Sequence, residues 1–121
     1  MFFQLRPEQI AAFEEEAQQG FRSRVVVYLR HRLPVQTAML TEGDLLARVQ
    51  LLQQRARAYG VVSERAVAKW AFLGIVLGER FDGIPAIHEY LRNNHLTPMA
   101  KVDGLMKTLY IRLRAREAGG K

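Results

Sequence analysis

The sequence contains no cysteine and only two serines, Ser23 and Ser63. The absence of cysteine excludes a disulfide framework, a thiolate metal site and a cysteine nucleophile. Neither serine lies in the Gly-x-Ser-x-Gly pattern that exposes a nucleophilic serine on a sharp turn. We therefore expect a fold held together by packing, without covalent catalysis by either residue type.

Long apolar runs are also lacking. The longest nearly apolar run spans residues 67–78 and contains Lys69, whereas a membrane-spanning helix needs about 20 apolar residues. Residues 1–7 offer only a few apolar side chains before Glu8, unlike the basic start and longer apolar core of a secretory signal. The sequence thus predicts a buried helix at residues 67–78 and a cytoplasmic protein that does not contact membranes.

The chain has few residues suited to metal or phosphate chemistry. Its three histidines, His31, His88 and His95, have no carboxylate at the i, i+3 or i, i+4 spacing that helical metal sites use, because neighbours such as His88 and Glu89 point to different helix faces. No Gly-rich phosphate loop with a following Lys-Ser/Thr is present. We expect no metal, no cofactor and no enzymatic activity.

What the sequence does contain is typical of one globular domain. It has 121 residues, of which 49% are hydrophobic and 25% are charged. These fractions are average for soluble folded chains, and the length fits a single domain. Apolar residues recur at steps of three and four throughout, and no alternating strand pattern has a partner. We predict a compact all-α single-domain bundle of about five helices over residues 1–121.

The helix boundaries follow from caps and prolines. A first long helix is expected at residues 7–32, with a proline at its start and another just beyond its end. Thr41, Ser63 and Thr97 are expected to cap further helices, because each precedes an apolar pattern at helical spacing. A short additional helix is expected within residues 84–94. Trp70 lies in the most apolar of these segments, and we expect it to be buried.

Nucleic-acid binding is a second possibility, because 18 Lys and Arg against 12 Asp and Glu give a net charge of +6. Residues 56–63 imitate the turn of a helix-turn-helix motif, but the helix after this turn is almost entirely apolar and could not present polar groups to bases. Arg112, Arg114 and Arg116 of the last helix are a candidate phosphate-binding patch. Positive charge at a helix C-terminus is also explained by the helix dipole.

Surface recognition of a protein is the activity that this elimination leaves. Aromatic and arginine side chains are enriched among residues that dominate binding energy at interfaces. The first three helices use most of their apolar residues in the core, so we expect the partner-binding residues in the irregular region and the last helix. The candidates are Arg80, Phe81, Tyr90, Arg92, Arg112 and Arg116.

The sequence also resembles a known group of proteins over about residues 10–110. The matching motifs are Phe21-x-x-Arg24, Tyr28-Leu29-Arg30, Leu33-Pro34, Arg55-x-x-x-Tyr59-Gly60-Val61-x-Ser63-Glu64-x-x-Val67, Leu73-x-x-x-x-Gly78-x-x-Phe81-Asp82 and Lys101-x-Asp103-x-Leu105. With these motifs, the chain resembles small helical proteins encoded in bacterial type VI secretion effector clusters, beside the spike protein and an effector adaptor.

The resemblance implies a non-catalytic accessory protein, or co-adaptor, that helps an adaptor hold a toxic effector for loading on the secretion spike. The partner would be the effector, the adaptor or both. An immunity protein that neutralises the effector would be a binding module of the same kind, with a different role. A small nucleic-acid-associated regulator remains a further alternative.

Overall fold

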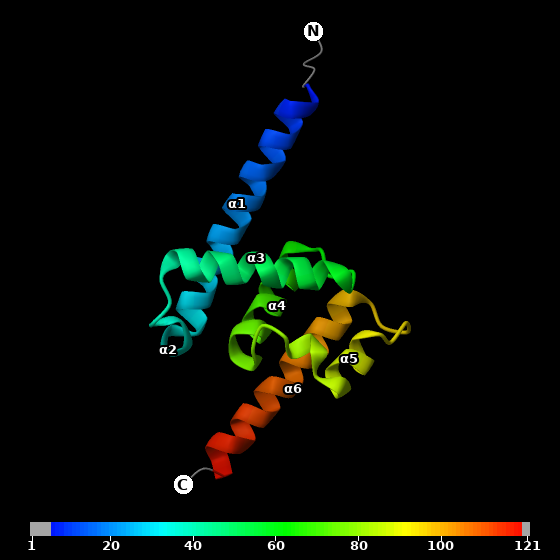
Figure 1. The fold of residues 1–121 in the computed structure, drawn as a ribbon. Helices are drawn as coiled ribbons and strands as arrows, with labels where there is room; N and C mark the ends of the chain where they lie inside the picture. The colour runs from blue at the N-terminus through cyan, green and yellow to red at the C-terminus, as the bar shows by residue number, and fades with distance from the viewer. Residues whose placement is uncertain (1–5, 120–121) are drawn as a thin grey trace.

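The computed structural model describes residues 6–119, and every regular element in this range is helical (Figure 1). The predicted all-α fold is therefore confirmed, with five helices of seven residues or more, one short helix and one 3-10 turn. In chain order the elements are α1 (Pro7–Arg32), α2 (Pro34–Thr37), α3 (Glu42–Ala58), α4 (Glu64–Leu77), η1 (Phe81–Gly83), α5 (Pro85–Leu91) and α6 (Pro98–Gly119).

The polar caps form where the sequence predicted them. The Thr41 hydroxyl accepts a hydrogen bond from the Asp44 amide at 3.1 Å, and the Ser63 hydroxyl accepts one from the Ala66 amide at 3.2 Å. Thr97 caps α6 in the same way, through the amide of Ala100. Each cap satisfies a backbone donor that has no partner within its own helix. These hydroxyls therefore fix where three of the helices begin.

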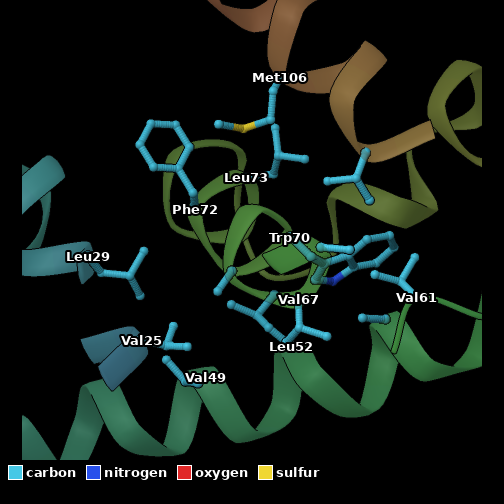
Figure 2. Packing of buried hydrophobic residues seen from close by; sticks show 14 of the residues in the cluster. Val25, Leu29, Val49, Leu52, Val61, Val67, Trp70, Phe72, Leu73 and Met106 are labelled. Atoms are coloured by element: carbon cyan, nitrogen blue, oxygen red, sulfur yellow. The ribbon is translucent and has the colours of Figure 1, made fainter. Parts of the chain in front are cut away.

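Helix α4 is the centre of the body, in contact with α1, α3 and α6. Its Trp70, Ala71 and Leu73 are completely buried, so the expected burial of Trp70 is confirmed. Figure 2 shows Trp70 among apolar side chains from the neighbouring elements. Leu52 of α3 lies so close to Gly74 that a Cβ atom at this glycine would collide with it. The bundle is thus packed tightly around one apolar helix.

Phe81 is buried, which corrects the expectation that it is exposed. Only 1% of its surface is accessible, and its ring centroid lies 4.7 Å from that of Trp70. The reason is that η1 folds back against α4 directly after the glycine turn at Gly78, whose φ is +104°. Phe81 is therefore a core residue, and it is not available as a surface anchor.

Two helices extend beyond the body, in opposite directions (Figure 1). The first part of α1 runs clear of the other helices, and its described side chains from Pro7 to Ala17 are all exposed. The last part of α6 extends from the other end. We call residues 7–17 the acidic arm and residues 111–119 the basic arm, because the first contains four glutamates and the second contains three arginines and one glutamate.

Candidate protein-binding groove

An apolar groove of about 380 Å³ lies between α5 and α6, and we call it the α5–α6 groove. Its lining comes from the end of α4, the segment before α5, α5 itself and α6. The lining residues are Leu77, Ile84, Ala86, Ile87, Tyr90, Leu105, Thr108, Leu109 and Arg112. Most of them are apolar, with one phenol, one hydroxyl and one guanidinium among them. Sites that bind a partner's side chains have this composition, with few polar groups on an apolar wall.

The groove is open because α5 and α6 each carry two apolar strips, one packed into the core and one that lines the groove. In α6, Val102 and Met106 face the core. Leu105 and Leu109, three positions after Val102 and Met106, line the groove. In α5, Leu91 is buried in the core, and Ile87 lies on the groove side. Residues three apart on a helix are neighbours, so the strip that lines the groove lies directly beside the strip that faces the core. The apolar pattern is therefore wider than the body can bury.

Large apolar side chains at the mouth of the groove remain accessible to solvent. Leu77 is 39% exposed and Ile84 is 43% exposed. An exposed aliphatic side chain alone is unremarkable, but contiguous apolar residues that surround a hollow are typical of interaction sites. The mouth of the groove is therefore suited to contact with an apolar side chain of another molecule.

Tyr90 is held in place at one wall of the groove. Its hydroxyl lies against Gly104 of α6, where any Cβ atom would overlap it. The backbone at Gly104 thus leaves room for the tyrosine ring to cross from α5 to α6. Tyr90 is half-buried and still lines the groove, so it is both a packing residue and a contact residue.

A second hollow adjoins the groove and shares Leu77 and Ile84 with it. Arg48 and Arg80 both line this hollow. The Arg48 Nε atom lies 3.4 Å from the Glu79 carboxylate, while Arg80 is exposed. With Arg112 in the groove itself, the lining of the two adjoining hollows contains three arginines, of which Arg48 is paired with Glu79.

A polar network fixes the wall that α5 forms. Arg55 of α3 donates to both carboxylate oxygens of Asp82, at 2.9 and 2.8 Å, and the Tyr59 hydroxyl donates to the same carboxylate at 3.2 Å. The Tyr59 oxygen also lies 3.1 Å from His88 Nδ1. This network joins α3 to η1 and α5. It therefore positions the segment that carries Ile84 and Ile87.

The chemistry of this network is structural. Burial raises the pKa of the Tyr59 hydroxyl, and the nearby Asp82 carboxylate raises it further, so the hydroxyl stays protonated and donates. The hydrogen bonds to Asp82 raise the pKa of the Arg55 guanidinium. Both carboxylate oxygens of Asp82 are occupied by these donors. The arrangement holds α3 and η1 together through three charge-assisted or polar hydrogen bonds.

The other end of α5 is fixed by a buried lysine. The Lys101 side chain is 7% exposed, and its Nζ atom donates to the Leu91 carbonyl oxygen at 2.6 Å. A charged donor to an orphan carbonyl at a helix C-terminus is favourable. Lys101 therefore ties the end of α5 to the beginning of α6, and both ends of the groove wall are anchored.

The structure brings together three of the six residues predicted from the sequence. Tyr90 and Arg112 line the groove, and Arg80 lines the adjoining hollow. Phe81 is in the core, Arg92 is exposed at the end of α5 outside the groove lining, and the Arg116 side chain is outside the part of the structure that is described. The candidate patch of Arg112, Arg114 and Arg116 is likewise described only at Arg112.

The aliphatic residues of the groove were not predicted. Leu77 lies in the run at residues 67–78 that the sequence predicts to be buried, whereas the structure leaves it 39% exposed. A usable signal was present, because Leu105, Leu109 and Arg112 recur at steps of four and three on a face adjacent to Val102 and Met106. Two neighbouring apolar stripes on one helix indicate two packing contacts. The body supplies the contact for Val102 and Met106.

Within the described residues, no group of three or more histidine, aspartate or glutamate side chains could hold a metal ion. None of the described helices is both long enough and apolar enough to cross a membrane. The chain matches no family model, no curated protein and no solved structure in the three comparisons made.

Proposed function

We propose that the protein is a non-catalytic accessory protein that binds a type VI secretion effector, its adaptor or both, for loading on the spike. The observation that supports binding is the open α5–α6 groove, whose wall is anchored at both ends by polar contacts. The resemblance of the sequence motifs supports the choice of partner. The two together favour a co-adaptor.

The shape and chemistry of the groove favour an amphipathic helix of the partner as its occupant. Two antiparallel or parallel helices form the walls of such a groove, and a third helix inserts apolar side chains spaced by three and four residues. Leu77, Ile84 and Leu109 supply the apolar contacts. A preformed groove reduces the entropy lost on binding, because its walls are already ordered.

Basic residues beside the groove indicate the charge of the occupant. Arg112 lies in the lining and Arg80 in the adjoining hollow. Both guanidinium groups would pair with carboxylates next to the apolar residues of the bound helix. We therefore expect an acidic amphipathic helix, which is a partner of a different chemistry from DNA.

Co-expression tests this proposal. The protein is produced together with the adaptor and the effector encoded by the neighbouring genes, and the purified complex is quantified. The test variant is Ile84→Glu, which places a carboxylate at the mouth of the groove. The control is Val35→Glu on α2, because Val35 is also an exposed aliphatic residue, at 82% exposure, and it does not line the groove.

We expect a stable complex with the wild-type protein and the control, and at least about a tenfold weaker affinity for Ile84→Glu, since a buried unpaired charge costs more than 1.4 kcal/mol. Unchanged melting curves show that both variants fold. Failure of the wild-type protein to bind either neighbour would reject the co-adaptor function. Equal binding by both variants would place the interface elsewhere, and nanomolar binding to duplex DNA that requires Arg112 would favour the nucleic-acid alternative.

A further inference from the structure

The acidic arm continues an apolar stripe for which the body provides no partner. In the body, Phe21, Val25 and Leu29 of α1 are buried. The same stripe continues toward the N-terminus through Ala17 and Ile10, at steps of four and seven residues. Ala17 is exposed and Ile10 is 43% exposed. The apolar face of α1 therefore extends past the point where contact with the body ends.

The basic arm shows the same feature at the other end. Near the end of α6, Tyr110 contacts the body: its hydroxyl accepts a hydrogen bond from Arg32 at 2.5 Å, and its ring centroid lies 6.4 Å from that of Phe72. Directly after it, Ile111 is 58% exposed and Arg112 is exposed. Helical segments of this length are marginal in water when they stand alone. Both arms gain stability if another helix covers them.

The charges of the two arms are complementary. The acidic arm carries Glu8, Glu14, Glu15 and Glu16 and has no lysine or arginine. The basic arm carries Arg112, Arg114 and Arg116 against a single glutamate. At 1.5 Å per residue, residues 7–17 span about 16 Å and residues 111–119 about 14 Å, so the two arms are similar in length. The chain thus contains two helical segments of opposite charge and similar length.

The two arms of one molecule point in opposite directions from the body, so they do not pair with each other (Figure 1). We propose that the partner of each arm is a second copy of this chain: the acidic arm of one molecule packs antiparallel against the basic arm of another. In an antiparallel pair the N-terminus of α1 lies beside the C-terminus of α6, which the helix dipoles also favour. If two molecules exchange both contacts, the assembly closes as a dimer with twofold symmetry.

This self-association is separate from the proposed function. The glutamates of the acidic arm do not line the α5–α6 groove. Charge reversal in the acidic arm therefore tests pairing without changing the groove. Conversely, the groove variant Ile84→Glu tests partner binding without changing either arm, so failure of one proposal is distinguishable from failure of the other.

Sedimentation velocity at low ionic strength, over protein concentrations from about 1 to 100 µM, measures the assembly. The first variant reverses the acidic arm with Glu8→Lys, Glu14→Lys and Glu16→Lys, and leaves Glu15 in its ion pair with Arg22. The second reverses the basic arm with Arg114→Glu and Arg116→Glu, and leaves Arg112 unchanged because it lines the α5–α6 groove. A matched control changes exposed acidic residues outside the arms: Glu42→Lys, Asp44→Lys and Glu89→Lys.

We expect the wild-type protein and the control to approach twice the 13.9 kDa mass of one chain as the concentration rises. Each arm variant alone should weaken self-association at least about tenfold, because like charges then face each other. An equimolar mixture of the two arm variants should form a mixed dimer, since every arm then meets one of opposite charge. Added salt should weaken the wild-type assembly by screening.

Three results would overturn the inference. One is a wild-type protein that stays monomeric over the whole concentration range at low salt. Another is a dimer that persists in both arm variants, which would place the interface elsewhere. The third is two monomeric arm variants that do not associate when mixed, which would show that charge complementarity between the arms is not the cause.

Discussion

Residues of one and the same helix have very different surroundings in the body and in the arms. In α1, Val25 and Leu29 are 2% and 0% exposed, whereas Ile10 on the same apolar stripe is 43% exposed. The sequence pattern is continuous along the helix, but the packing partner is not. Periodicity therefore identifies a helix and its apolar face, and it does not tell how much of that face the same chain covers.

The two regions also differ in what stabilises them. In the body, helices gain free energy from apolar burial against α4, at about 25 cal/mol for each Å² removed from water. In the arms, the described side chains contribute mainly local interactions, such as the ion pair between Glu15 and Arg22 at 3.1 Å. Exposed pairs of this kind contribute about 0–1 kcal/mol. Substitutions should therefore have large effects in the body and small ones in the arms.

The largest effect is expected for Trp70→Ala. Trp70 is completely buried and lies against Tyr59 and Phe81. Its truncation removes apolar contact and leaves a cavity, which costs about 3–5 kcal/mol of unfolding free energy. Thermal and urea unfolding, followed by circular dichroism, measure the loss. A melting temperature within one or two degrees of the wild type would mean that α4 is not the centre of the core.

An intermediate effect is expected for Asp82→Ala, compared with Glu15→Ala. Asp82 is 4% exposed and accepts hydrogen bonds from Arg55 and Tyr59, so its removal should cost about 1.5–3 kcal/mol. Glu15 also pairs with an arginine, but its side chain is 60% exposed, and the loss should be below about 1 kcal/mol. Urea unfolding of the two variants side by side gives the difference. Equal losses would show that burial does not distinguish the two ion pairs.

Much of the body could be predicted from the sequence because local signals and packing agree there. The caps at Thr41, Ser63 and Thr97 act within four residues, so a short stretch of sequence contains both partners. The burial of Trp70 follows from an apolar segment that no exposed helix could carry. These features depend little on how the helices are arranged in space.

The parts that could not be predicted depend on that arrangement. Phe81 lies in an irregular segment with no periodicity, so its burial against Trp70 became visible only once η1 was placed on α4. The groove likewise requires the relative position of α5 and α6, which is set by Asp82 and Lys101. Tyr90 and Arg112 were predicted from residue type alone, and the aliphatic residues between them were not.

The smallest effect on the isolated chain is expected for the double variant Ile10→Ser and Ile111→Ser, with one change in α1 and one in α6. Both side chains are largely exposed, at 43% and 58%, so at low protein concentration the unfolding free energy should change by no more than about 0.5 kcal/mol.

The proposed pairing of arms adds a second expectation for this double variant. A folded dimer makes the melting temperature rise with protein concentration through mass action. If the arms cover each other between molecules, the wild-type melting temperature should rise between about 1 and 100 µM, and the double variant should show a smaller rise. Scanning calorimetry at both concentrations measures this difference. A large destabilisation at the low concentration would show that the arms pack within one molecule, and identical concentration dependence would show that these isoleucines do not contribute to an interface.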